Sequence, residues 1–260
     1  MVPKPNLAHG AFFALSGQVF TLGVTFAYNA LIFTFAASLG FGLAASALIS
    51  LIAVGVFAGL IVPRFAALAP NMMIVTTLAL AIVLMEAVRI GASGRDFWLP
   101  QIGSESLQLG FGASITTIQF YNILAIMSLL ITADIVLART PAGRNIRAVS
   151  QDKKAASLCG INVDKTIILT AATSAILALL GGLLAVLYFG NMSFGAGLTY
   201  GLKVLFIAAA GGFSTPRIAA IAAFGFGEAE ALWDGYLPII WREAFFYSAL
   251  SVMLIVKGRT

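Results

Sequence analysis

Charged residues are scarce in this chain. Lys, Arg, Asp and Glu make up 10% of its 260 residues, whereas soluble domains carry about 25%. Residues 5–63 contain none of the four. Hydrophobic residues reach 60% and the mean hydropathy is +1.01, which excludes an ordinary soluble protein. The composition therefore predicts an integral membrane protein.

Cysteine and histidine are almost absent. Cys159 is the single cysteine, so an intrachain disulfide is impossible. His9 is the single histidine, which argues against a metal site built from histidines and against a Ser/His/Asp hydrolase. A phosphate-binding loop of the form GxxxxGK[ST] is missing as well, so this chain has no such site for ATP. We expect neither an enzyme nor a bound cofactor.

Apolar segments fill most of the chain. About 20 apolar residues cross a bilayer, because each adds ~1.5 Å of helix. On this measure we expect an all-α integral membrane protein, with residues 1–260 forming one transmembrane domain of about eight spanning or half-spanning helices. The expected segments are residues 11–37, 43–62, 71–91, 116–138, 166–189, 197–211, 218–235 and 239–256. A short loop at 64–70 and a longer one at 92–115 separate some of them.

One polar stretch interrupts this pattern, and we name residues 139–165 the basic insert. It holds two acids, Asp152 and Asp164, and the six bases Arg139, Arg144, Arg147, Lys153, Lys154 and Lys165. Basic loops near membrane ends face the cytoplasm, so we place the insert there. Lys257 and Arg259 fall on the same side four crossings later, and the loop at 92–115 falls outside. The net charge of +5 thus reflects orientation rather than nucleic-acid binding.

The basic insert has the signals of one amphipathic helix. Thr140 is a favourable N-cap, Pro141 suits the first helical position, and Gly160 suits the left-handed residue after a helix. Its expected apolar face consists of Ile146, Val149, Ala156 and Cys159. Such a helix can lie on anionic lipid or can dock onto another protein, and the physical pattern leaves both possibilities open.

Several motifs resemble the permease family of branched-chain amino acid ABC transporters. The resemblance lies in Asn6–Gly10, Thr140–Arg144, Arg147–Val149, Gln151–Asp152, Ala156, Gly160–Asp164, Gly181–Gly182, Gly201–Lys203, Gly211–Gly212 and Glu228. The family usually has one more helix before the first of these motifs, so the resemblance also predicts that this chain lacks the usual first transmembrane helix.

The resemblance implies a function and a set of partners. The chain would be a permease subunit of an ATP-driven importer in the cell inner membrane. It would act with ATP-binding cassette subunits, a second related permease and an external solute-binding protein. The insert would be the cytoplasmic coupling helix, with Arg144, Arg147, Asp152, Ala156, Gly160 and Ile161 forming the surface that meets the ATPase.

Charges inside the apolar segments are candidates for function, since a charge at the centre of a membrane helix costs about 2.5–3.5 kcal/mol. Glu86 and Arg89 are three residues apart and are expected to form a structural pair. Lys203 lies deeper, and Glu228 or Glu230 could neutralise it. We expect these last three residues to be candidates for the translocation path.

Two other classes of protein remain compatible with these residues. An ion-coupled secondary transporter would use the Lys203 and Glu228 group as its coupling site. A truncated, non-transporting membrane subunit would bind partners without moving solute. Uptake that survives ATP depletion would favour the first class.

Overall fold

The computed structural model describes residues 8–65, 70–100, 102–110, 113–211 and 216–257. Asn6, Gly212, Arg259 and most of the loop at 64–70, all named above, lie outside the described residues. The chain divides into two compact units, residues 1–198 and 199–260, and each is described by itself.

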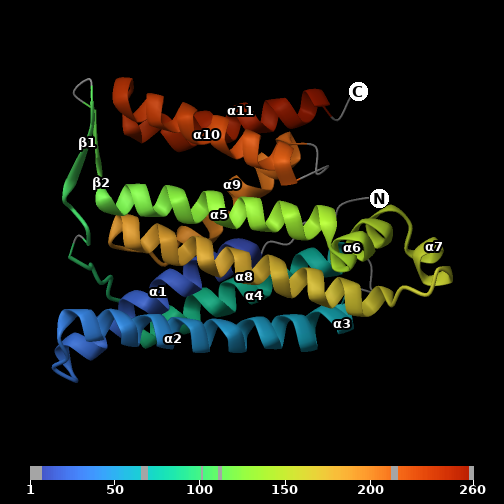
Figure 1. Cartoon of the computed structure of the whole chain (residues 1–260), viewed down its shortest axis with the longest axis horizontal. Coiled ribbons are helices and arrows are strands. Elements are labelled where there is room, and N and C mark those ends of the chain that lie inside the picture. The colour runs from blue at the N-terminus through green and yellow to red at the C-terminus, as the bar shows by residue number, and fades with distance from the viewer. Residues whose placement is uncertain (1–7, 66–69, 101, 111–112, 212–215, 258–260) are drawn as a thin grey trace. The chain divides into compact units, whose positions relative to one another are not determined.

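The first unit is a bundle of helices with one short hairpin (Figure 1). Its elements are α1 (Ala8–Asn29), α2 (Phe35–Val56), a π-helical turn (Phe57–Ile61), α3 (Val62–Phe65), α4 (Pro70–Gly91), β1 (Ser106–Gly110), β2 (Ala113–Thr116), α5 (Thr117–Arg139), α6 (Pro141–Gln151), α7 (Lys153–Leu158), α8 (Val163–Phe189) and the first residues of α9 (Ala196–Ala210).

Five helices in the described part of the chain are long and apolar enough to cross a membrane. They cover residues 8–29, 35–64, 74–91, 117–139 and 163–189. The all-helical class is therefore confirmed, and helices occupy each of the predicted segments. Figure 1 shows the insert helices α6 and α7 at one end of α5 and the hairpin at the other.

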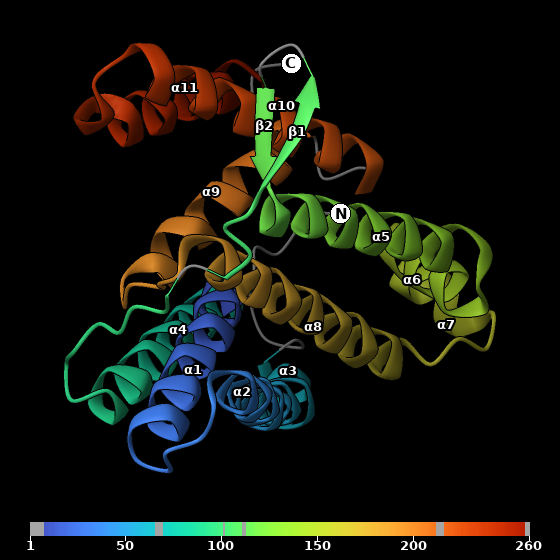
Figure 2. The ribbon, with the colours of Figure 1, turned by 60° about the vertical axis from the view of Figure 1, so that its left-hand side comes forward.

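Helix α1 is the centre of the first unit, packed between α2, α4 and α8 (Figure 2). Ser16 joins three of these helices. Its hydroxyl donates to the carbonyl of Leu179 in α8 (2.7 Å), and its own carbonyl accepts a hydrogen bond from the hydroxyl of Ser46 in α2 (2.8 Å). Both serines are completely buried. Such bonds hold helices together in lipid, where apolar burial alone supplies little attraction.

Small residues let α2 approach α1 closely. The buried face of α2 repeats every four residues, with Ser38, Gly42, Ser46 and Ser50. A Cβ atom at Gly42 would lie 2.9 Å from the carbonyl oxygen of Phe20 in α1, too close for any side chain. This is the small-residue spacing that favours close helix contacts in membranes.

The second unit consists of most of α9, α10 (Pro216–Tyr236), a 3-10 turn (Ile239–Trp241) and α11 (Arg242–Lys257). Aromatic rings pack α10 on α11. Trp233 stacks on Phe245 with ring centroids 4.5 Å apart, and Phe226 meets the edge of Phe246 at 5.0 Å. Aromatic pairs of this kind add about 0.5–1.5 kcal/mol beyond the area they bury.

The boundary between the first two helices differs from the prediction. The turn lies at residues 30–34, not at Ser38–Gly42, which is inside α2. It contains neither glycine nor proline, and Ile32 itself adopts a positive φ of 54°. Thr34 then caps α2, with its hydroxyl oxygen accepting from the N–H of Ala37 (3.4 Å). Because the turn is apolar, hydropathy could not reveal it.

The loop predicted at 92–115 also contains regular structure. Strands β1 and β2 pair antiparallel, with Ser106 opposite Thr116 and an irregularity between Gln108 and Gly110. Thr116 then begins α5 with a capping box, in which its hydroxyl oxygen and the side chain of Gln119 each accept the other's backbone N–H. The hairpin thus leads directly into a spanning helix.

Neighbouring glycines provide a matched test of the α1–α8 contact. A Cβ atom at Gly182 would collide with the carbonyl of Phe13, whereas one at Gly181 would meet the Phe13 ring at an ordinary 3.5 Å. We expect Gly182→Ala to destabilise the protein by about 3 kcal/mol, as overpacking does, and Gly181→Ala to have little effect. Thermal unfolding of the two variants in detergent measures this, and equal midpoints would contradict the packing described.

Candidate functional site

The basic insert starts without a loop, because Thr140 both ends α5 and begins α6. Its N–H donates to the carbonyl of Val136 in α5 (3.2 Å), and its hydroxyl oxygen accepts from the N–H of Gly143 in α6 (3.2 Å). Pro141 occupies the first position of α6, where no N–H is needed. A Cβ atom at Gly143 would collide with the carbonyl of Leu137. Helix α6 is therefore held against the end of α5.

The insert forms two helices, where one was expected. At Asp152 the backbone is extended (φ −150°, ψ 114°), and α6 ends. The Asp152 carboxylate then accepts hydrogen bonds from the N–H groups of Lys154 (2.7 Å) and Ala155 (3.1 Å), which begins α7. Aspartate competes well with the helix for these N–H groups, so it favours a cap over a continuous helix.

Hydrogen bonds also fix the C-terminal end of the insert. Gly160 has a φ of 80°, its N–H donates to Ser157 (3.0 Å), and the N–H of Ile161 donates to Ala156 (3.1 Å). This pair of bonds is the Schellman ending of a helix, which favours glycine at the left-handed residue. The Asn162 side chain then accepts from the N–H of Lys165 (2.9 Å) and starts α8.

The predicted coupling residues divide between structure and surface. Arg144 is exposed and forms no ion pair within the described residues. Arg147 is exposed too, but its guanidinium donates to the carbonyls of Leu137 and Ala138 at the end of α5. Ala156 is 4% exposed and packs inward. The shape of the insert therefore depends on five of the predicted residues, Arg147, Asp152, Ala156, Gly160 and Ile161. Arg144 faces outward instead.

Residues outside the predicted coupling set complete the exposed surface of the insert. Lys153 and Lys154 are exposed beside the break, and Leu158 is 89% exposed. The break at Asp152 rotates α7 relative to a continuous helix, which explains why Cys159, predicted on the apolar face, is exposed instead. Val149 and Ala156 are buried as predicted, and Ile146 is half-buried.

A network of charges joins the helices of the second unit. Lys203 in α9 is 7% exposed, and its Nζ lies 2.7 Å from Glu230 Oε1 in α10 and 3.0 Å from Glu243 Oε1 in α11. Arg242 continues the network, with Nη2 3.3 Å from Glu243 Oε1 and Nη1 2.5 Å from Asp234 Oδ2. Charges in apolar surroundings are tolerated when they are paired in this way.

This network differs in membership from the predicted group. Glu230 is part of it, whereas Glu228 is exposed and pairs with none of the described residues. Arg242 and Glu243, the first two residues of α11, were not among the predicted residues. The predicted pair in the first unit is confirmed, since Arg89 Nη2 lies 2.8 Å from Glu86 Oε2.

Within the described residues, no group of three His, Cys, Asp or Glu side chains is placed to hold a metal ion. His9 Nδ1 lies 3.3 Å from the hydroxyl of Ser174 in α8, so it contributes to the contact between α1 and α8.

These helices define a multi-pass α-helical membrane protein. A family model described as "Branched-chain amino acid transport system / permease component" matches residues 2–256, so the chain belongs to this family. This description agrees with the family that the sequence motifs resemble.

Individual relatives agree with this family. The "high-affinity branched-chain amino acid transport system permease protein LivH" of Escherichia coli and that of Salmonella typhimurium are each 29% identical over 187 residues, 70% of this chain. The protein BraD of Pseudomonas aeruginosa, with the same description, is 22% identical over 191 residues, 71% of this chain. The matched region spans 61% of each relative's length. No solved structure matches the chain.

Asp152 allows capping to be separated from charge. Asp152→Asn keeps an oxygen that can accept both N–H groups, whereas Asp152→Ala removes it and is expected to cost about 1 kcal/mol. We expect greater protease cleavage within the insert for Asp152→Ala than for Asp152→Asn, measured by limited proteolysis in detergent. Equal cleavage of the two variants would show that the carboxylate acts through its charge instead.

The charged network predicts a large effect at one residue. Lys203→Met leaves the Glu230 carboxylate without its ammonium partner, and we expect it to destabilise the protein by about 3 kcal/mol. This value is at the low end for a broken buried ion pair, because the Glu243 side chain is 38% exposed. Glu228 is exposed and forms no ion pair with the described residues, so Glu228→Gln should change stability by less than about 0.5 kcal/mol. Thermal unfolding compares the two, and equal losses would contradict the pairing.

Proposed function

We propose that the chain is the transmembrane permease subunit of an ATP-driven ABC importer for branched-chain amino acids or a similar small polar solute. Membership in the permease family and the five apolar helices support this proposal. In it, residues 1–260 act as one transmembrane domain of the cell inner membrane. The basic insert and the C-terminus face the cytoplasm, where basic loops are favoured.

The observation that carries the proposal is the stiff connection of the basic insert to two spanning helices. Thr140 joins the insert to α5 and Asn162 joins it to α8, each with a cap and without a free linker. The insert then exposes cationic side chains that lack partners among the described residues, beside the apolar side chain of Leu158. A surface that combines unpaired charge with an exposed apolar anchor suits a protein partner better than water.

The proposed partner is an ATP-binding cassette subunit, with a second related permease and an external solute-binding protein completing the importer. ATP binding would bring two such subunits together and displace the docked inserts. Because no flexible linker separates the insert from either spanning helix, that displacement would reach α5 and α8 directly. These helices would then open and close the solute path.

Energy coupling separates this proposal from an ion-coupled transporter that would use Lys203 and Glu230 as part of the translocation path. Uptake of radiolabelled leucine by membrane vesicles should require ATP and should survive an uncoupler. Uptake that needs an ion gradient and not ATP would favour the ion-coupled mechanism.

Arg144 is the residue for testing the docking surface, because Arg147 also holds the end of α5. We expect Arg144→Glu to reduce co-purification of an ATP-binding cassette protein from native membranes at least tenfold, since it places like charge at a contact. Arg64→Glu is the matched control, as Arg64 is an exposed base in α3, at the same end of the bundle and outside the insert (Figure 1). Equal co-purification with both variants would instead indicate that the insert lies on lipid.

A further inference from the structure

Non-helical backbone lies at membrane depth between α8 and α9. Residues 190–195 form no helix, and Gly190 ends α8 with a φ of 73°. The carbonyl of Ser193 in this segment accepts a hydrogen bond from Gln18 Nε2 (2.9 Å). Gln18 is halfway along α1, a helix of 22 residues that is long enough to span, so Ser193 is level with the middle of that helix. Irregular backbone is tolerated there only when it is buried in protein or lines a cavity.

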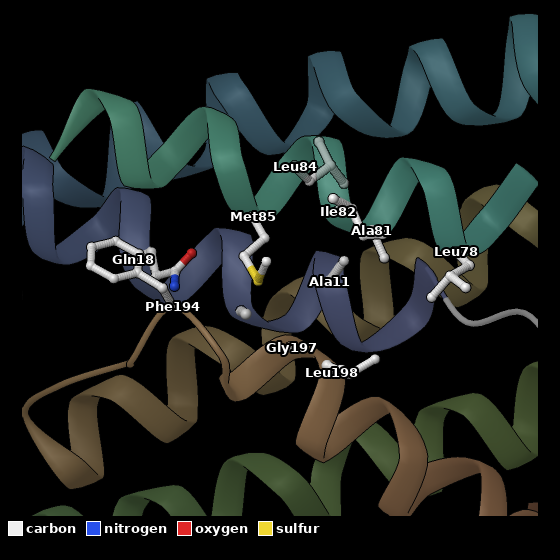
Figure 3. Close-up of a pocket in the computed structure, with 11 residues that line it drawn as sticks. Ala11, Gln18, Leu78, Ala81, Ile82, Leu84, Met85, Phe194, Gly197 and Leu198 are labelled. Carbon is white, nitrogen blue, oxygen red and sulfur yellow. The ribbon is translucent and has the colours of Figure 1, made fainter. Parts of the chain in front are cut away.

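A cavity of about 100 Å³ adjoins this segment. Its walls come from α1, from α4 and from residues 194–198, all in the first unit. Figure 3 shows Gln18, Phe194 and Met85 toward one end and Leu78 toward the other. Small residues leave the space open, because Ala11 and Ala14 line it and Gly197 approaches the backbone of α1.

Gln18 is the one polar side chain among the residues that line this cavity. It is 4% exposed, and its Nε2 is engaged by Ser193, whereas its Oε1 accepts no hydrogen bond from the described residues. Ligand sites usually combine apolar walls with a few placed polar groups. The cavity therefore offers room for an apolar group and an acceptor for an N–H group beside it.

We propose that this cavity binds the branched aliphatic group of three or four carbons of the transported solute, with Gln18 Oε1 accepting from an N–H or ammonium group next to it. A dry cavity of about 150 Å³ holds a benzene ring, so one of about 100 Å³ selects a smaller aliphatic group and excludes an indole. A lipid acyl chain has no N–H group and would leave the amide oxygen without a donor. The inference rests on the proposed function and adds that the permease itself selects by side-chain size.

Two alanines of α4 give a matched test. Ala81 lines the cavity, whereas Ala79 on the same helix is exposed and does not. The full chain in nanodiscs is titrated with radiolabelled leucine and valine. Ala81→Leu should weaken binding of both at least tenfold, while Ala79→Leu, which adds the same volume outward, should bind as wild type does. Equal affinity of the two variants overturns the proposal, as does a wild type without saturable binding, the result expected if lipid fills the cavity.

A second variant keeps the test valid if Ala81→Leu does not fold. Met85→Ala widens the cavity, so the ratio of phenylalanine to leucine affinity should rise at least tenfold. An unchanged ratio overturns the proposal.

The Arg144→Glu co-purification distinguishes failure of this site from failure of the importer mechanism. If an ATP-binding cassette protein is lost from Arg144→Glu but leucine binds Ala81→Leu normally, the importer stands and the cavity site falls. If binding is lost from Ala81→Leu and no such protein co-purifies with wild type, the cavity site stands and the importer mechanism falls.

Discussion

The close contact between the backbone of α1 and its neighbours is the constraint on which the first unit depends. Lipid tails are as apolar as the helices, so these helices gain little from apolar burial and must instead exchange hydrogen bonds at short range. A shift of α1 at Ser16 would break hydrogen bonds to two helices at once. The Ser16 hydroxyl donates to α8, and its carbonyl accepts a hydrogen bond from α2. The position of α1 then determines where Gln18 meets Ser193, and thus where the chain can leave α8 and enter α9.

Much of this fold could be predicted from the sequence, because long apolar runs bounded by charge leave few alternatives to spanning helices. Helices α4 and α5 begin and end within one residue of the predicted segments. The turn at 30–34 could not be predicted, since Ile32 adopts its left-handed conformation without glycine or proline. The four-residue spacing of small residues in α2 was visible in the sequence and would have indicated its packed face.

The candidate site has two parts, the basic insert and the network of charges in the second unit. Both were predicted less completely than the fold, each for a different reason. In the basic insert the predicted helix start at Thr140 and the left-handed Gly160 are confirmed, but capping by Asp152 divides the helix and changes which side chains face outward. In the second unit the partner of Lys203 depends on how α10 and α11 approach α9, and spacing along the chain contains no information on that approach. Glu243, 40 residues from Lys203, therefore joins the network while Glu228 does not.

The joint at Thr140 has a mechanical consequence. Helix α6 has 11 residues and is about 16 Å long, at a rise of ~1.5 Å per residue. With its base clamped to α5, it behaves as a short lever arm, so a tilt of about 10° moves its far end by only about 3 Å. A small sideways force on α7, at the far end of this lever, likewise exerts a torque on its base at the end of α5. In the proposed importer, a stroke of a few ångströms at the insert would thereby be converted into rotation of α5.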